Sequence, residues 1–208
     1  IKKHIEMTFG NFLNEINIFM PLGSRYKSKC LPWDPFIEKY SQKKPTEPIK
    51  DENNTIKTTF YILPKRTDFE EEYEFDQAAG STGKWIDRQG IYIYRKGRLI
   101  LPGGWHGLTY QGRKIEAKDN YLNRIRVKID YDGKNDSKWK LKVSKSEAII
   151  PAPIRKRLEQ LVTKIIDEVK NSEKKVSKVK DKSGYETPWI MTETKNIKKF
   201  TISRNHEL

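Results

Sequence analysis

The spacing of apolar residues predicts a helix at each end of the chain and strands between them. Residues 2–14 place their apolar side chains on one helical stripe, although Gly10 weakens this helix by about 1 kcal/mol. Residues 154–169 follow a three- and four-residue spacing that predicts a long amphipathic helix after two prolines. The pattern fades beyond residue 170, which indicates a projecting helix or a linker.

Between these helices the pattern changes to that of short strands and turns. β-branched and aromatic runs predict strands, proline-rich polar stretches predict loops, and an acidic run indicates a solvated helix. These rules predict strands over 16–20, 25–33 and 55–63, a loop over 41–54, and a short acidic helix over 68–78.

The middle of the chain has the clearest strand pattern. Residues 90–101 read as a hairpin around Lys96–Gly97. Residues 124–130 and 138–143 alternate strictly between apolar and basic side chains, which indicates one buried and one solvent-facing side. If these two strands pair, six basic side chains share the solvent-facing side, namely Arg124, Arg126, Lys128, Lys138, Lys140 and Lys142.

Charge and composition narrow the class of protein. The 208 residues carry a net charge of +14, which falls almost entirely after residue 83 and points to a polyanion or to a solubilising excess of lysine. The aromatic content exceeds that of a disordered tail, and no apolar run is long enough to cross a bilayer. The single cysteine, Cys30, excludes an internal disulfide framework. We therefore expect a cytoplasmic protein, and the isoleucine at position 1 indicates a piece of a longer chain.

No complete active site can be read from the residues alone. The segment GSTGKW at 80–85 lacks the spacing of a phosphate-binding loop, and the three histidines lack metal-ligand spacing, so no metal is expected. Lys145 follows a predicted strand and precedes the long helix. It is either an ordinary surface lysine or a point charge that reaches a phosphate.

Six ordered segments resemble one known family. They are WDPF at 33–36, YILP at 61–64, QGIYIYRKGRLILPGGWHGL at 89–108, RIRVKID at 124–130, SKSEAIIPAPIRKRL at 144–158 and ISRNHEL at 202–208. Together they resemble the bacterial GHKL-type ATP-binding proteins related to gyrase, MutL and the microrchidia (MORC) ATPases. The opening HIEMTFGNFL resembles the end of the ATPase domain, and the rest of the chain resembles the ribosomal-S5-like transducer domain.

The resemblance implies a division of the chain and a set of roles. Residues 1–14 would end the ATPase domain, 15–170 would form the transducer, and 171–208 would extend beyond it. Lys145 would contact the terminal phosphate of ATP, although Ser144 departs from the family's common second lysine. Arg95, Arg98 and Trp105 match a structural motif. ATP and magnesium would be bound by the parent protein, whose ATPase domain is a partner of this chain and forms a homodimer.

We therefore expect an α+β fold, with a mixed sheet, helices mainly on one face and a long C-terminal helix. The expected function is to couple ATP hydrolysis in a GHKL-type ATPase to conformational change in DNA-related processes, while this chain alone is inactive. The alternatives are a free-standing nucleic-acid-binding module that uses the basic sheet face, and a chaperone-like interaction domain.

Overall fold

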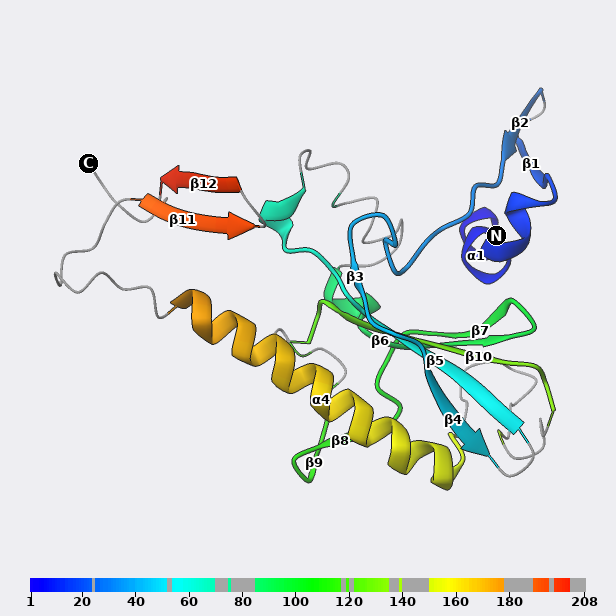
Figure 1. Ribbon diagram of the computed structural model, residues 1–208. Coiled ribbons are helices and arrows are strands. Elements are labelled where there is room, and N and C mark those ends of the chain that lie inside the picture. The colour runs from blue at the N-terminus through cyan, green and yellow to red at the C-terminus, as the bar shows by residue number, and fades with distance from the viewer. Residues whose placement is uncertain are drawn as a thin grey trace, which may run out of the picture. The chain divides into compact units, whose positions relative to one another are not determined.

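The computed structural model of the chain, drawn in Figure 1, contains two units, Ile1–Glu168 and Val169–Leu208. It describes residues 1–23, 25–51, 54–69, 75, 85–116, 119, 122–134, 139, 150–177, 189–194 and 197–202. The fold is α+β, as the sequence predicts.

One central strand, β10 (Ile125–Tyr131), organises the mixed sheet of the first unit. It pairs antiparallel with β5 (Asn54–Ile62) on one edge and parallel with β6 (Gly90–Arg95) on the other. Beyond β6 lies β7 (Arg98–Pro102), and β5 also pairs with β3 (Gln42–Lys43) and β4 (Glu47–Asp51). Both edges of β10 are therefore occupied (Figure 1).

Shorter elements complete the described chain. They are α1 (Lys2–Thr8), η1 (Gly10–Asn14), β1 (Phe19–Leu22), β2 (Tyr26–Lys29), η2 (Arg66–Asp68), η3 (Trp85–Arg88), β8 (Thr109–Tyr110) and β9 (Arg113–Lys114) in the first unit. The second unit holds the hairpin of β11 (Trp189–Thr194) and β12 (Ile197–Ile202). Among the described residues, no helix is both long and apolar enough to span a membrane.

The local sequence signals predicted several elements correctly. The hairpin over 90–101 is confirmed, and its turn residues Lys96 and Gly97 have φ of 49° and 80°, as a type I′ turn requires. The strand over 55–63 is confirmed as β5. The strands predicted over 16–20 and 25–33 are found with shifted bounds as β1 and β2, which pair with each other. The first helix is shorter than predicted, because α1 ends at Thr8 and a 3₁₀ turn follows.

The structure differs from the sequence analysis in two places. The segment 41–54 is not a loop, since it contains β3 and β4, and β4 lies at a sheet edge where Pro48 is tolerated. The strand over 124–130 cannot pair with a strand over 138–143, since β5 and β6 already occupy both of its edges. Of residues 138–143 the structure describes Trp139, which is buried and stacks on Tyr131 with 4.8 Å between ring centroids.

The long helix α4 (Ala152–Ser177) confirms the predicted helix after residue 151 and begins slightly earlier. Up to Glu168 it lies along one face of the sheet (Figure 1). Ile154, Leu158 and Val162 on this helix are buried, as are Ile125, Val127 and Ile129 of β10. Burying two apolar surfaces against each other is the main favourable contribution to folding here.

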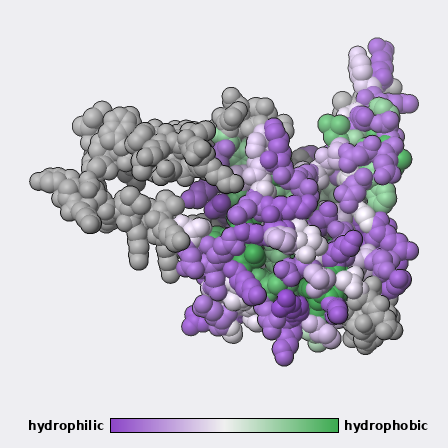
Figure 2. All heavy atoms as spheres, in the orientation of Figure 1, coloured by the Kyte–Doolittle hydropathy of each residue, from purple (hydrophilic) through white to green (hydrophobic). Residues whose placement is uncertain are grey.

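Aromatic side chains cover the opposite face of the sheet. Phe36 lies among Tyr61, Tyr92 and Tyr94, with ring centroids 4.7, 5.4 and 6.2 Å away. The alternating polar residues of β10 therefore point toward an aromatic layer and not directly into solvent. On the outside of the molecule, Figure 2 shows a mostly hydrophilic face with small hydrophobic patches.

Candidate functional site

The centre of the predicted basic face is buried and does not face solvent. Arg126 is only 1% exposed, and its guanidinium donates hydrogen bonds to the carbonyls of Asn123, Ile125 and Trp85. Burial lowers the pKa of Arg126 to about 10, so the group stays charged at neutral pH. The prediction that Arg126 lies on a solvent-facing side is therefore wrong.

The remaining members of that face are less exposed than predicted, or lie outside the described residues. The Arg124 side chain donates a hydrogen bond to the Leu63 carbonyl and is only partly exposed. Lys128 keeps 21% of its side chain exposed. Lys138, Lys140, Lys142 and the phosphate-contact candidate Lys145 fall outside the residues that the structure describes.

Trp105 of the predicted structural motif belongs to a buried polar network. Its indole N–H donates to the Gln89 side-chain oxygen at 2.9 Å, and that oxygen also accepts the Asp119 backbone N–H. The Gln89 amide nitrogen donates to the carbonyls of Ile86 and Asp119. Because every polar atom of this buried amide has a partner, the network stabilises the connection between η3 and the segment before β10.

The other two motif residues, Arg95 and Arg98, flank the turn of the β6–β7 hairpin. The Arg98 guanidinium lies over the Phe9 ring, 5.1 Å from its centroid. The Arg95 guanidinium lies against Gly133, close to where a Cβ on that glycine would be. Both residues therefore contact segments outside their own hairpin.

The segment 1–14 is joined to this hairpin at its turn. The Asn11 side-chain amide donates a hydrogen bond of 3.0 Å to the Gly97 carbonyl. The Phe12 ring approaches Gly97 so closely that a Cβ there would lie 3.2 Å from it. Together with the Arg98–Phe9 contact, these interactions connect the N-terminal segment to the sheet.

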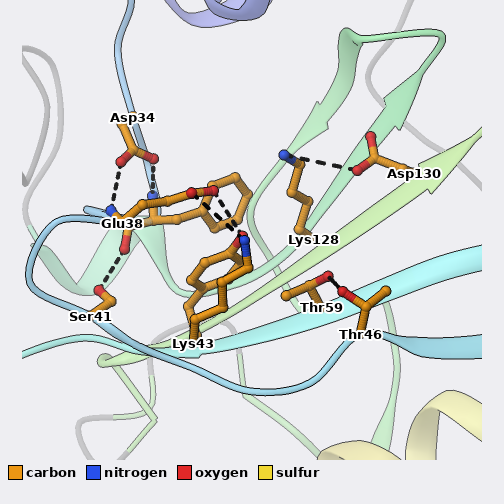
Figure 3. Close-up of polar contacts among 10 residues, drawn as sticks. Asp34, Glu38, Ser41, Lys43, Thr46, Thr59, Lys128 and Asp130 are labelled. Carbon is orange, nitrogen blue, oxygen red and sulfur yellow. Dashed lines mark hydrogen bonds and ion pairs between the residues drawn. The ribbon is translucent and has the colours of Figure 1, made fainter.

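A cleft of about 390 Å³ opens between this N-terminal segment and the aromatic face of the sheet. We call it the Lys128 cleft, and Figure 3 shows the polar contacts around it. Its lining comes from η1, from the loop that connects β2 to β3, and from β6 and β10, and consists of Gly10, Asn11, Asn14, Pro32–Phe36, Glu38, Tyr94 and Lys128.

Lys128 is the cation of the cleft. Its ammonium lies 5.5 Å from the centroid of the Phe36 ring and 5.3 Å from that of Tyr94. The nearest carboxylate oxygen is that of Asp130, at 3.9 Å. Burial raises the pKa of Asp130, while the charges of Lys128 and Lys57 oppose this rise. The rings and the carboxylate together hold the ammonium in a partly desolvated position.

The loop on the other side of the cleft is fixed by its own hydrogen bonds. The two Asp34 oxygens accept the backbone N–H groups of Phe36 and Glu38 at 2.8 and 2.7 Å (Figure 3). Ser41 donates its hydroxyl proton to the Phe36 carbonyl. Ile37 has φ of 49°, which is a strained conformation for a β-branched residue. Such a conformation persists only where surrounding contacts hold the loop in place.

Glu38 joins this loop to the sheet. Its carboxylate accepts the Tyr61 hydroxyl at 2.8 Å and lies 3.8 Å from the Lys43 ammonium. Burial, together with the Glu38 carboxylate, raises the pKa of Tyr61 well above its ordinary value, and burial likewise raises that of Tyr94. Both phenols are therefore neutral hydrogen-bonding groups at physiological pH.

Sequence reasoning missed this cleft. It treated Lys128 as a solvent-facing cation and used WDPF only for a family resemblance. An aspartate between an aromatic residue and Pro35 is a turn signal, because its carboxylate can accept backbone N–H groups two to four residues later. No local spacing could have shown that η1 and β10 line the same space.

Chemically, the cleft offers a ligand charged groups of both signs, from Asp34, Glu38 and Lys128. Among the described residues, no three potential ligand side chains are gathered in a way that could hold a metal ion. Comparisons with protein-family models, with curated proteins and with solved structures found no match to this chain.

Proposed function

We propose that this chain transmits movement of an attached ATP-binding domain into its own sheet, as the transducer region of a GHKL-type ATPase. The contact between the segment 1–14 and the β6–β7 turn carries the proposal. In the family that the chain resembles, the segment similar to HIEMTFGNFL would end the ATPase domain and the segment similar to YRKGRLI would lie in the transducer. A displacement of the N-terminal segment would therefore be transmitted to the β6–β7 turn.

The contact is suited to such a role because it is short and specific. Asn11 donates to a backbone carbonyl, and the Phe12 ring lies so close to Gly97 that a Cβ there would be 3.2 Å away and the ring would have to shift. Movement of η1 would thus change both the hydrogen bond and the ring contact at the turn of the hairpin.

The remaining roles belong to the parent protein. ATP and magnesium would bind in its ATPase domain, Lys145 would contact the terminal phosphate, and a homodimer would change the state of bound DNA. A positive charge directed at that phosphate stabilises the transition state of phosphoryl transfer. Sequence-independent DNA binding in the nucleic-acid alternative would rely on phosphate contacts.

The test compares two substitutions in the longer protein that contains this chain. Asn11→Ala removes the hydrogen bond to Gly97, and Gly97→Ala places a methyl group against Phe12. We expect both to change kcat for ATP hydrolysis by about tenfold, with a smaller effect on ATP affinity.

Gly112→Ala is the matched control. Gly112 also has a positive φ, of 75°, but nothing lies within 4 Å of its missing Cβ. It therefore reproduces the backbone strain without the contact and should leave kcat unchanged. Wild-type kcat in both Asn11→Ala and Gly97→Ala would refute the transducing role of this contact.

A further inference from the structure

We propose that the Lys128 cleft is a binding site for a small zwitterion of the α-amino acid class. The site lies within this chain, and its occupancy does not depend on the transducing role proposed for the N-terminal contact. Its volume of about 390 Å³ falls in the range of small-molecule sites.

The cationic half of the site is the Lys128 ammonium. An ammonium has three hydrogen-bond donors, and the 3.9 Å separation from Asp130 is too long for a hydrogen bond. Its other neighbours are the faces of Phe36 and Tyr94, which attract a cation but accept no conventional hydrogen bond. A ligand carboxylate in the cleft would supply the missing acceptors.

The anionic half is the Asp34 carboxylate. Each of its oxygens accepts one backbone N–H, whereas an ionised carboxylate has about four acceptor sites. Glu38, the other carboxylate of the lining, accepts the Tyr61 hydroxyl with one oxygen, and its other oxygen lies 3.8 Å from the Lys43 ammonium. Asp34 can therefore accept hydrogen bonds from a ligand ammonium while the loop stays intact.

The charge of the lining argues against a polyanion. Two carboxylates and one ammonium line the cleft, so an inorganic phosphate or a nucleotide would meet like charges. An amino acid brings one carboxylate and one ammonium, which matches a lining of both signs. Electrostatic matching of this kind provides selectivity between ligands.

Aromatic side chains supply the apolar part of the lining. Trp33, Phe36 and Tyr94 line the cleft, and the Trp33 indole nitrogen is buried without a hydrogen-bond partner among the described residues. An apolar or aromatic ligand side chain would pack against these rings. The fixed loop around Asp34 keeps the site formed before binding, which lowers the entropic cost of association.

The Trp33 indole N–H provides a direct readout. In a ¹⁵N-labelled sample of this chain, its cross-peak is assigned by its loss in Trp33→Phe. The protein is titrated with L-phenylalanine, phenylacetate, phenethylamine and inorganic phosphate. We expect a saturable shift with phenylalanine, at least tenfold weaker binding of phenylacetate and phenethylamine, and no shift with phosphate.

Substitutions then test each half of the site. Lys128→Met and Asp34→Asn should each weaken phenylalanine binding at least tenfold, which corresponds to about 1.4 kcal/mol. Lys134→Met removes an exposed lysine charge, on a side chain 74% exposed, and should change nothing. Lys128→Arg retains the charge and should retain part of the binding, provided that the amide spectrum of each variant shows a folded protein.

Four results would overturn the proposal. They are an unshifted Trp33 cross-peak with phenylalanine, equal binding by Lys128→Met, phenylacetate bound as tightly as phenylalanine, and phosphate bound most tightly of all. The first two results would show that phenylalanine does not bind at this cleft. The last two would show that the cleft prefers another class of ligand. None of these results bears on ATP hydrolysis by the longer protein, so the transducing role is tested separately.

Discussion

Arg126 connects two turns through the interior of the protein. Its guanidinium donates to the carbonyls of Asn123 and Ile125 at the start of β10, and to that of Trp85 in η3. We predict that Arg126→Met lowers the free energy of unfolding by about 1–3 kcal/mol, because it removes hydrogen bonds to three buried or partly buried carbonyls. Urea denaturation measures this as a lower midpoint with an unchanged slope.

Lys128→Met serves as the comparison, since Lys128 lies on the same face of β10 and is only partly buried. It should cost clearly less stability than Arg126→Met. Equal stability of Arg126→Met and wild type would show that these three hydrogen bonds contribute nothing net. A charge reversal at Arg126 is not a test of nucleic-acid binding, because the group does not reach the surface.

His106 gives the stability a dependence on pH. Burial lowers its pKa below the ordinary 6.5, the nearby Arg155 charge lowers it further, and the hydrogen bond to the Gly103 carbonyl opposes the shift. Between pH 6.5 and this lower folded pKa, the unfolded chain therefore binds more protons at His106 than the folded chain does. The contribution of neutral His106 to the free energy of unfolding is therefore complete above pH 6.5. It is lost as the pH falls from 6.5 through the folded pKa.

We predict that His106→Asn reduces the loss of stability between pH 7.5 and pH 5.5. Asparagine tolerates the φ of 49° at this position and does not titrate. Urea midpoints of both proteins at the two pH values give the comparison, and the opposite contribution of Asp130, whose pKa is raised by burial, cancels between them. Parallel pH profiles of the two proteins would contradict the prediction.

At the scale of the elements, β6 begins where two backbones nearly touch. A Cβ on Gly90 would lie 2.3 Å from the Gly104 carbonyl oxygen, and Gly90 has φ of 100°. We predict that Gly90→Ala costs at least about 2 kcal/mol of stability, since both strain and overlap must be relieved. Thermal or urea unfolding measures this loss.

Gly112→Ala, in the turn between β8 and β9, is the control for strain alone. It has a φ of 75° and open space around the missing Cβ, so it should cost about 1–2 kcal/mol. A smaller loss for Gly90→Ala than for Gly112→Ala would mean that the approach to Gly104 is easily relaxed.

The elements differ in how far the sequence could predict them. The β6–β7 hairpin was predictable because Lys96–Gly97 carries its turn signal locally. β4 was not, because its pairing with β5 is decided by a partner in another part of the chain. The alternation in β10 correctly separated its two sides, but it could not show that an aromatic layer covers the basic one. The Lys128 cleft was unpredictable for the same reason, since its lining comes from separated segments of the chain.

At the scale of the whole molecule, the two units should differ in local stability. β10 has a hydrogen-bonded neighbour on both edges and buried apolar side chains. β11 and β12 form a two-stranded sheet, which is marginally stable in water on its own. We predict slow amide exchange in β10 and much faster exchange in β11 and β12, measured by hydrogen–deuterium exchange with mass spectrometry.

Equal protection of β10 and β11–β12 would contradict this prediction. It would show that the second unit gains stability from contacts outside its own hairpin. A shortened chain is unnecessary for this measurement, because peptides from each strand report separately within the intact protein.

The position of β10 also determines the order in which the sheet can form. β5 and β6 are not neighbours, and each joins the sheet through β10, which comes later in the chain than either. During synthesis, β3–β5 and the β6–β7 hairpin must therefore wait as separate pieces until residues 125–131 have been made. Such late, long-range pairing slows folding and leaves strand edges open in the meantime. We therefore expect the nascent chain up to about residue 124 to expose the edges of β5 and β6 that β10 later pairs with.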